Sequence, residues 1–201
     1  YPDLDSSQMH IYLVNASDRL LSAMDPMSSK RAEADLKELH VHIRQPQFAT
    51  EYKDGILKTS AGLKIPTQTV IWVSGICANK IEGFPAESIG HAGRLLTDRF
   101  CRVKGLKDVY AIGDISLIEG DEEYPLGHPQ LAQVAMQQAK TVAKNLKAIA
   151  KGEEPKPFKY KNLGVMATIG RNHAVAEISG KKFGGFPAWV LWLIVHLRSI
   201  L

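Results

Sequence analysis

The chain has 201 residues, enough for one large domain or two small ones. Its 25 basic and 21 acidic residues leave a net charge of +4, which is too balanced for a nucleic-acid-binding protein but suits an anionic cofactor or membrane surface. Cys77 and Cys101 are isolated in the sequence, so we expect a reducing compartment rather than a disulfide framework. No stretch reaches the roughly 18 apolar residues of a membrane span, and the first residues do not form a signal peptide.

The first part of the chain alternates predicted strands with a helix. Met9 to Asn15 has the apolar composition of a buried strand. Residues 26–39 place apolar side chains near one helical face and charged side chains on the rest. Val41 to Arg44 returns as a short strand. This order is typical of an α/β domain.

Three short, partly alternating segments follow, and turn residues such as Asp54-Gly55 separate them. They predict a small antiparallel meander over residues 47–52, 55–59 and 63–67. Gln68 to Gly75 is predicted to be another buried strand, ending in a small residue and a glycine. Cys77 follows it closely, and a lone cysteine is more often a small buried residue than a reactive one.

A glycine and a proline mark residues 81–89 as a linker, and residues 93–103 predict a strand with turns. Val109 to Ile112 then predicts a buried strand of a parallel sheet that ends at Gly113. A glycine at this point allows a ligand to approach the backbone closely. Asp114 follows at the carboxyl end of the strand, where ligands bind in open α/β sheets. An ordinary strand and turn would have the same pattern.

Pro129 precedes a predicted helix from Leu131 to Ala150, which carries small residues on its early turns and ends at Lys151-Gly152. Small residues there would let a planar group come close. His128 could face such a group, although a surface loop is the more common position for a histidine in this setting. Residues 153–157 form a linker.

The last part of the chain predicts two strands, residues 165–169 and 174–178, followed by a helix from Phe186 to Leu197. This helix is apolar on nearly every side, and Trp189 and Trp192 suit a bilayer interface. It is too short to span a membrane. Two interpretations stay open: a membrane-associating helix, or a buried helix or subunit contact.

Two motifs resemble those of a known family. Asp114, Pro129 and the Ala-Gln-x-Ala-x-Gln pattern of residues 132–137 are similar to the second flavin motif of the type II NADH:quinone oxidoreductases. Residues 164–171 resemble the C-terminal signature of the same family. The resemblance extends over nearly the whole chain. It implies the C-terminal half of a longer protein whose other half would carry the two glycine-rich phosphate loops.

The resemblance implies an α/β fold class with portions of Rossmann-like FAD- and NAD(P)-binding domains, a small antiparallel β-meander and a C-terminal membrane-associating helix. We expect residues 1–83 to belong to the NADH-binding domain. Residues 84–152 would belong to the FAD-binding domain, and residues 153–201 would form a β-hairpin and the apolar helix.

Site residues follow from the same resemblance. NADH contacts are expected at Asn15, which stands where the family has an acid that binds the ribose, and at Ser74 and Gly75 near the nicotinamide end. Because Asn15 repels a phosphate less than an acid would, the preference for NADH over NADPH stays open. Catalytic roles toward the quinone are expected of Gln133 and Gln137. The residues expected to bind FAD are Gly113, Asp114, Ala132, Gln133, Ala135 and Lys161.

The implied activity is the oxidation of NADH and the reduction of a membrane quinone through FAD, without proton pumping. Expected partners are the quinone, the membrane surface on the cytoplasmic face and a second subunit in a homodimer; nucleic acid is excluded. No metal-ligand cluster, paired carboxylates or Ser-His-Asp arrangement is recognisable in the sequence, so no metal site is expected. The alternatives are a related flavoprotein with another acceptor, such as a sulfide:quinone or ferredoxin reductase, or a non-catalytic nucleotide-binding module.

Overall fold

The structure is a computed structural model that describes the backbone of residues 9–200. The chain divides into two compact units. The first unit comprises the residues up to Ile71 and those from Leu163 onward, and the second comprises residues 72–162. Residues 9–71 therefore fold together with residues 163–200, and the central part forms a unit of its own.

The first unit begins with a β-α-β arrangement. The strand β1 (Ile11–Val14) pairs in parallel with β2 (Val41–Arg44), and α1 (Pro26–Glu38) connects them. The side chain of Asp25 accepts a hydrogen bond from the Met27 amide at 2.8 Å, which caps the helix. The predicted helix is confirmed to within one residue.

A three-stranded antiparallel meander follows, in the order β3 (Ala49–Lys53), β4 (Ile56–Thr59) and β5 (Lys64–Pro66). Its first turn is Asp54-Gly55, and both residues have positive φ values, 51° and 72°. This is the conformation that a tight hairpin turn with the right-handed twist of a sheet requires. The predicted meander is confirmed.

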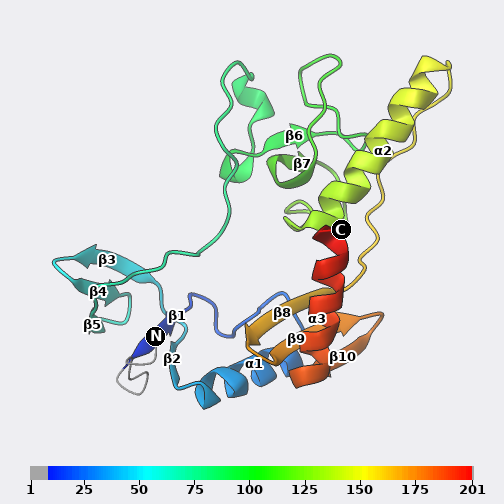
Figure 1. The fold of residues 1–201 in the computed structure, drawn as a ribbon. Coiled ribbons are helices and arrows are strands. Elements are labelled where there is room, and N and C mark those ends of the chain that lie inside the picture. Colours follow the sequence, from blue (N-terminus) through cyan, green and yellow to red (C-terminus); the bar gives the residue numbers. More distant parts are fainter. Residues whose placement is uncertain (1–8, 201) are drawn as a thin grey trace. The chain divides into compact units, whose positions relative to one another are not determined.

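The C-terminal part of the first unit is a second antiparallel sheet in the order β10-β9-β8. Its elements are β8 (Val165–Gly170), β9 (His173–Ile178), β10 (Lys181–Gly184) and the helix α3 (Gly185–Ile200). Both α1 and α3 contact these strands (Figure 1). The two predicted strands are confirmed at nearly their expected bounds.

Alternation along β9 explains how two helices cover this sheet, since successive side chains of a strand point to opposite faces. Ala174 and Ala176 are completely buried and pack against Ala188 of α3. Glu177 lies on the other face, where its carboxylate accepts a hydrogen bond from the Ser28 hydroxyl of α1 at 2.6 Å. The sheet therefore lies between α1 and α3.

The second unit contains little sheet. The strands β6 (Leu95–Thr97) and β7 (Ser116–Ile118) pair in parallel, and the long helix α2 (Ala132–Ala150) follows them. The predicted helix is confirmed to within one residue. Three short 3₁₀ turns complete the unit: η2 (Ala86–Ser88), η3 (His91–Gly93) and η4 (Gly113–Ile115). One buried cluster joins these elements through Cys101, Ile118, Val134 and Phe158.

Two predicted buried strands are wrong. Residues 69–80 have no regular structure, and Ile71, Trp72 and Val73 are 68–81% exposed. Val109 to Ile112 forms a single bridge between Tyr110 and Arg102 instead of a strand. An apolar run becomes a buried strand only where neighbouring strands satisfy its backbone, and the described residues give neither segment a ladder.

The burial of β1 and of Cys77 also differs from the prediction. The strand β1 is not buried, because Ile11 remains 53% exposed in a sheet of two strands. Cys77 is exposed in its irregular segment, whereas Cys101 is completely buried. Burial raises the pKa of the Cys101 thiol to about 12, so this thiol stays protonated. Of the helices in residues 9–200, none is both long and apolar enough to cross a bilayer.

Candidate functional site

The candidate site is built around the turn at Gly113 and Asp114, at the start of β7. Gly113 has a φ of +71°, a left-handed conformation that glycine adopts without strain. Its amide donates a 2.6 Å hydrogen bond to Oε1 of Gln138, a side chain that is 1% exposed. The side chain of Asp114 remains exposed. The turn thus holds a carboxylate toward solvent on a backbone that a buried amide fixes in place.

Close packing fixes the same turn against α2. A Cβ atom at Gly113 would lie 3.2 Å from Cβ of Ala135, which is tighter than ordinary contact. A glycine and an alanine are therefore needed to bring the turn and the helix this close together. Ala135 packs against the protein's own turn, whereas Ala132, one turn earlier, is exposed.

The first turn of α2 lies beside Asp114. The residue before the helix, Leu131, has extended backbone and makes no side-chain cap. No side chain caps the positive end of the helix dipole, so the backbone amides of the first turn can interact with an anionic group at this end. Gln130 donates from its amide to the Asp114 carbonyl oxygen at 3.2 Å, and Gln133 is half-buried in the first turn.

The side chain of Gln137 is engaged with protein backbone. Its amide donates to the Lys161 carbonyl and accepts from the Lys161 amide, both at 2.9 Å. This paired contact fixes the backbone at Lys161, whose side chain is exposed. The structure thus brings two predicted site residues together, but it gives Gln137 a positioning role.

A buried arginine that the sequence analysis did not single out lies under the turn. Arg94 is 6% exposed and donates to the backbone carbonyls of Ser116 and His128. Burial lowers the pKa of its guanidinium, and the charge of Asp114 acts in the opposite direction. Arg94 therefore ties β7 to the loop before α2 and adds positive charge beneath the carboxylate.

His128 is buried, so its expected position in a surface loop is wrong. Its ring stacks on Tyr124 at a centroid distance of 4.6 Å and meets the edges of Phe158 and Tyr160. Burial lowers the pKa of His128, although Asp121, with Oδ2 3.3 Å from Nε2, opposes this effect. Phe158 and Tyr160 lie 30 and 32 residues beyond His128 in the sequence, so no local pattern indicated this cluster.

The residues predicted to contact NADH fall in different units. Asn15 follows β1 in the first unit, and its side-chain amide donates to the backbone carbonyls of Ser17 at 3.0 Å and Arg19 at 3.3 Å. Ser74 and Gly75 belong to the second unit and are exposed in its irregular segment. Gly75 has a φ of +91°.

Residues 3–139 match the pyridine nucleotide-disulphide oxidoreductase family. This match covers most of the chain, and the chain belongs to that family of oxidoreductases. The expected fold class is confirmed. Within this class, the chain is 32% identical over 98% of its length to the type II NADH:quinone oxidoreductase Ndh of Mycobacterium tuberculosis, of which it covers 44%. The resemblance noted in the sequence is thus confirmed, and the chain spans about half the length of the curated relatives it matches.

Two solved structures share the fold. NDH2 from Plasmodium falciparum in complex with NADH has a TM-score of 0.83 at 16% identity, over 96% of this chain and 55% of that one. The sulfide:quinone oxidoreductase of Aquifex aeolicus has a TM-score of 0.72 at 12% identity, over 94% of this chain and 48% of that one. Likeness at such low identity concerns the fold and not the substrate.

Proposed function

We propose that the full-length protein oxidises NADH and reduces a quinone through bound FAD. The observation that carries this proposal is the Gly113–Asp114 turn, which Gln138 and Ala135 fix at the positive end of α2. The similarity to a type II NADH:quinone oxidoreductase supports the choice of reaction. We further propose that the enzyme acts without pumping protons, as its resemblance to this family implies.

The residues at this turn fit a flavin. The exposed carboxylate of Asp114 can accept hydrogen bonds from the hydroxyl groups of a ribityl chain. The absence of a side chain at Gly113 allows close approach to the backbone. FAD would supply the chemistry itself, by accepting a hydride and passing the electrons on. The protein residues bind, orient and balance charge.

The other residues take distinct parts in this proposal. Ala132 offers an exposed surface without bulk, and the amides of the first turn of α2 would favour negative charge on a group bound there. Gln133 can both donate and accept hydrogen bonds, which suits the orientation of a quinone head group. Gln137 acts through Lys161, whose backbone it holds. The exposed side chain of Lys161 would supply a cation to the flavin.

We assign the nucleotide substrate to residues outside this turn. Asn15 would bind the adenosine ribose, and Ser74 and Gly75 would lie near the nicotinamide. Because Asn15 already donates to two backbone carbonyls, its side-chain oxygen is the atom that would accept a bond from the ribose. An amide repels a phosphate less than a carboxylate does, which leaves room for NADPH.

The apolar helix α3 supports a peripheral membrane location. Ala188 is completely buried against β9, whereas Phe186, Ile194 and Leu197 are 51–58% exposed. Exposed apolar side chains in the first turn and the C-terminal half of a tryptophan-containing helix suit the bilayer interface. We propose attachment at the cytoplasmic face of the membrane and a homodimeric state, with quinone reached from the bilayer.

The two cysteines bear on the alternative acceptors. A sulfide-oxidising relative would need a reactive thiolate, and burial raises the pKa of Cys101 to about 12. Cys77 is exposed and remains the one candidate among the described cysteines. A ferredoxin reductase or a non-catalytic module is distinguished by activity, since neither would reduce a quinone with NADH.

The test combines activity with one substitution. The full-length protein should bind FAD and oxidise NADH in a quinone-dependent manner. Asp114→Ala should lose flavin during purification, because a charge-assisted hydrogen bond contributes about 1.5–3 kcal/mol. Flavin absorbance per mole of protein measures this loss, and Glu119→Ala, after β7, is the control. Wild-type flavin content in Asp114→Ala would remove this assignment, and a flavoprotein without quinone reductase activity would refute the function.

A further inference from the structure

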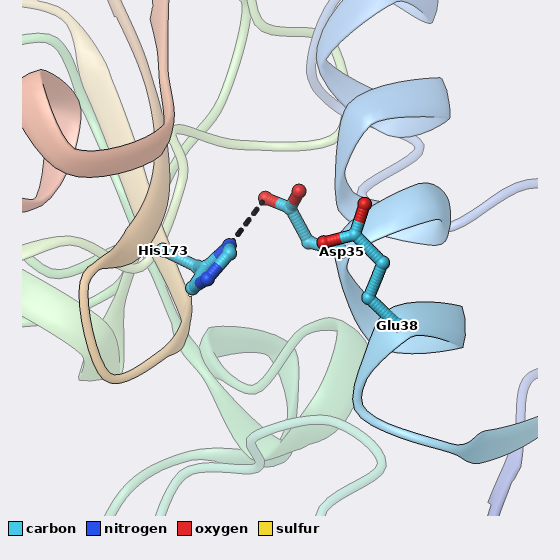
Figure 2. Close-up of side chains that lie close together, drawn as sticks. All are labelled: Asp35, Glu38 and His173. Atoms are coloured by element: carbon cyan, nitrogen blue, oxygen red, sulfur yellow. Dashed lines mark ion pairs between the residues drawn. The ribbon is translucent and has the colours of Figure 1, made fainter.

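Three side chains that are distant in the sequence meet within the first unit. Asp35 and Glu38 lie three residues apart on the last turns of α1, so they share one side of the helix. His173 begins β9. One ligand atom from each residue lies within 4.8 Å of the other two, and Figure 2 shows Asp35 and His173 directed toward each other. The sequence predicted no metal site because helix and hairpin are so far apart along the chain.

The buried carboxylate of Asp35 is only half satisfied. Its side chain is 2% exposed, and Oδ1 accepts a 2.9 Å hydrogen bond from Nε of Arg31. The other oxygen, Oδ2, is buried and has no hydrogen-bond partner among the described residues. Nδ1 of His173 is also buried and has no hydrogen-bond partner among the described residues. Buried polar atoms nearly always have a hydrogen-bond partner, so two facing atoms that lack one and meet only as a long ion pair indicate a third group between them.

The distance between these two atoms indicates what that group is. Oδ2 of Asp35 and Nδ1 of His173 are 3.5 Å apart. A charge-assisted hydrogen bond would hold them at about 2.7–2.9 Å. Two ligands of one tetrahedral zinc ion, each about 2.0–2.1 Å from the metal, lie roughly 3.3 Å from each other. The observed separation is close to this value.

We propose that Asp35, Glu38 and His173 bind a divalent transition-metal cation of the zinc type. Imidazole with carboxylates favours such a metal over calcium or magnesium, which prefer oxygen ligands alone. Two carboxylates and the Arg31 guanidinium leave a net negative charge at the site. Glu38 is exposed, so a fourth position is open to solvent. The cation would join α1 to the β8–β9 hairpin, a role separate from the proposed electron transfer.

Cobalt(II) tests this site, because tetrahedral cobalt absorbs visible light in proportion to the bound ion. The chelator-treated full-length protein should bind one equivalent, and zinc should displace it. Glu38→Gln and His173→Gln should each weaken cobalt binding at least tenfold. Glu33→Gln on the same helix, where Glu33 pairs with Lys37, should bind as the wild type does. Flavin content should be unchanged in all variants.

The exposed position of Glu38 keeps the test decisive, since its substitution should not disturb folding. If Glu38→Gln binds cobalt as tightly as the wild type, the cluster is an Asp35–His173 ion pair and the proposal is wrong. Absence of cobalt absorption at millimolar concentrations would also overturn it. Loss of flavin in the wild type would count against the proposed function and leave the cation site standing.

Discussion

The C-terminal sheet and the Gly113–Asp114 turn are held in place by different means. The sheet β8-β9-β10 satisfies its backbone through its own ladder and packs small side chains against α3. The turn lies in the short 3₁₀ segment η4, outside any sheet, where Gln138 and Arg94 bond to main-chain groups instead. Buried backbone needs partners in either case. The second unit, with little sheet, thus depends on buried polar side chains to satisfy its backbone.

The largest effect is expected from steric crowding at the C-terminal sheet. Gly164 has a φ of +113°, and a Cβ atom there would lie 2.5 Å from the Glu177 carbonyl oxygen. Gly164→Ala should therefore destabilise the protein by about 3 kcal/mol or more. Gly62 has a φ of +80° with no atom within 4 Å of such a Cβ, so Gly62→Ala isolates the backbone cost of about 1–2 kcal/mol. Denaturant unfolding measures both, and equal costs would contradict the steric account.

Removal of a buried polar side chain tests how the Gly113–Asp114 turn is held. Gln138→Leu keeps most of the volume but removes the acceptor of the Gly113 amide. An unsatisfied buried amide costs about 1–3 kcal/mol. We expect a loss of stability in this range together with weaker flavin retention. Gln130→Leu, which removes a more exposed bond to Asp114, should cost less than about 0.5 kcal/mol. If the two variants behave alike, the buried amide does not support the turn.

The smallest effect concerns His128, which is buried among aromatic rings. Its pKa is lowered in the folded state, so the unfolded chain binds the proton more readily. His128 should therefore have no effect on the free energy of unfolding well above pH 6.5. As the pH drops below this value, the free energy of unfolding should fall by at most about 1.4 kcal/mol per pH unit. His128→Phe should abolish this fall, and the exposed His91→Gln should keep it. Unfolding curves at several pH values check this, and an unchanged pH profile in His128→Phe would refute it.

Local patterns predicted the elements that depend on local contacts. Four parts of the chain form close to their expected bounds: α1, α2, the meander, and the hairpin of β8 and β9. In each of them the backbone hydrogen bonds join residues that are close in the sequence. Val109 to Ile112 and Gln68 to Gly75 were misjudged, since a parallel strand depends on distant partners that composition does not reveal.

The same reason governs the candidate site. The flavin motif indicated Gly113, Asp114 and the early turns of α2, and the structure brings these residues together. Nothing in the sequence marked Gln138 as the partner of the Gly113 amide or Arg94 as the buried cation below the turn. Both roles arise from tertiary contacts between residues 22 or more positions apart, as the Arg94–Ser116 pair shows. Such contacts leave no periodic signal.

Three polar side chains of α2 connect distant parts of the second unit. Gln137, Gln138 and Asn145 on this helix hold the backbone at Lys161, Gly113 and Lys156. A helix moves as a stiff rod, with its residues spaced about 1.5 Å apart along the axis. Its three attachments therefore cannot shift independently. A ligand that immobilises the Gly113 turn would therefore also restrain the segment that leads to Lys161. The two sides of the proposed flavin site are thus coupled through one helix.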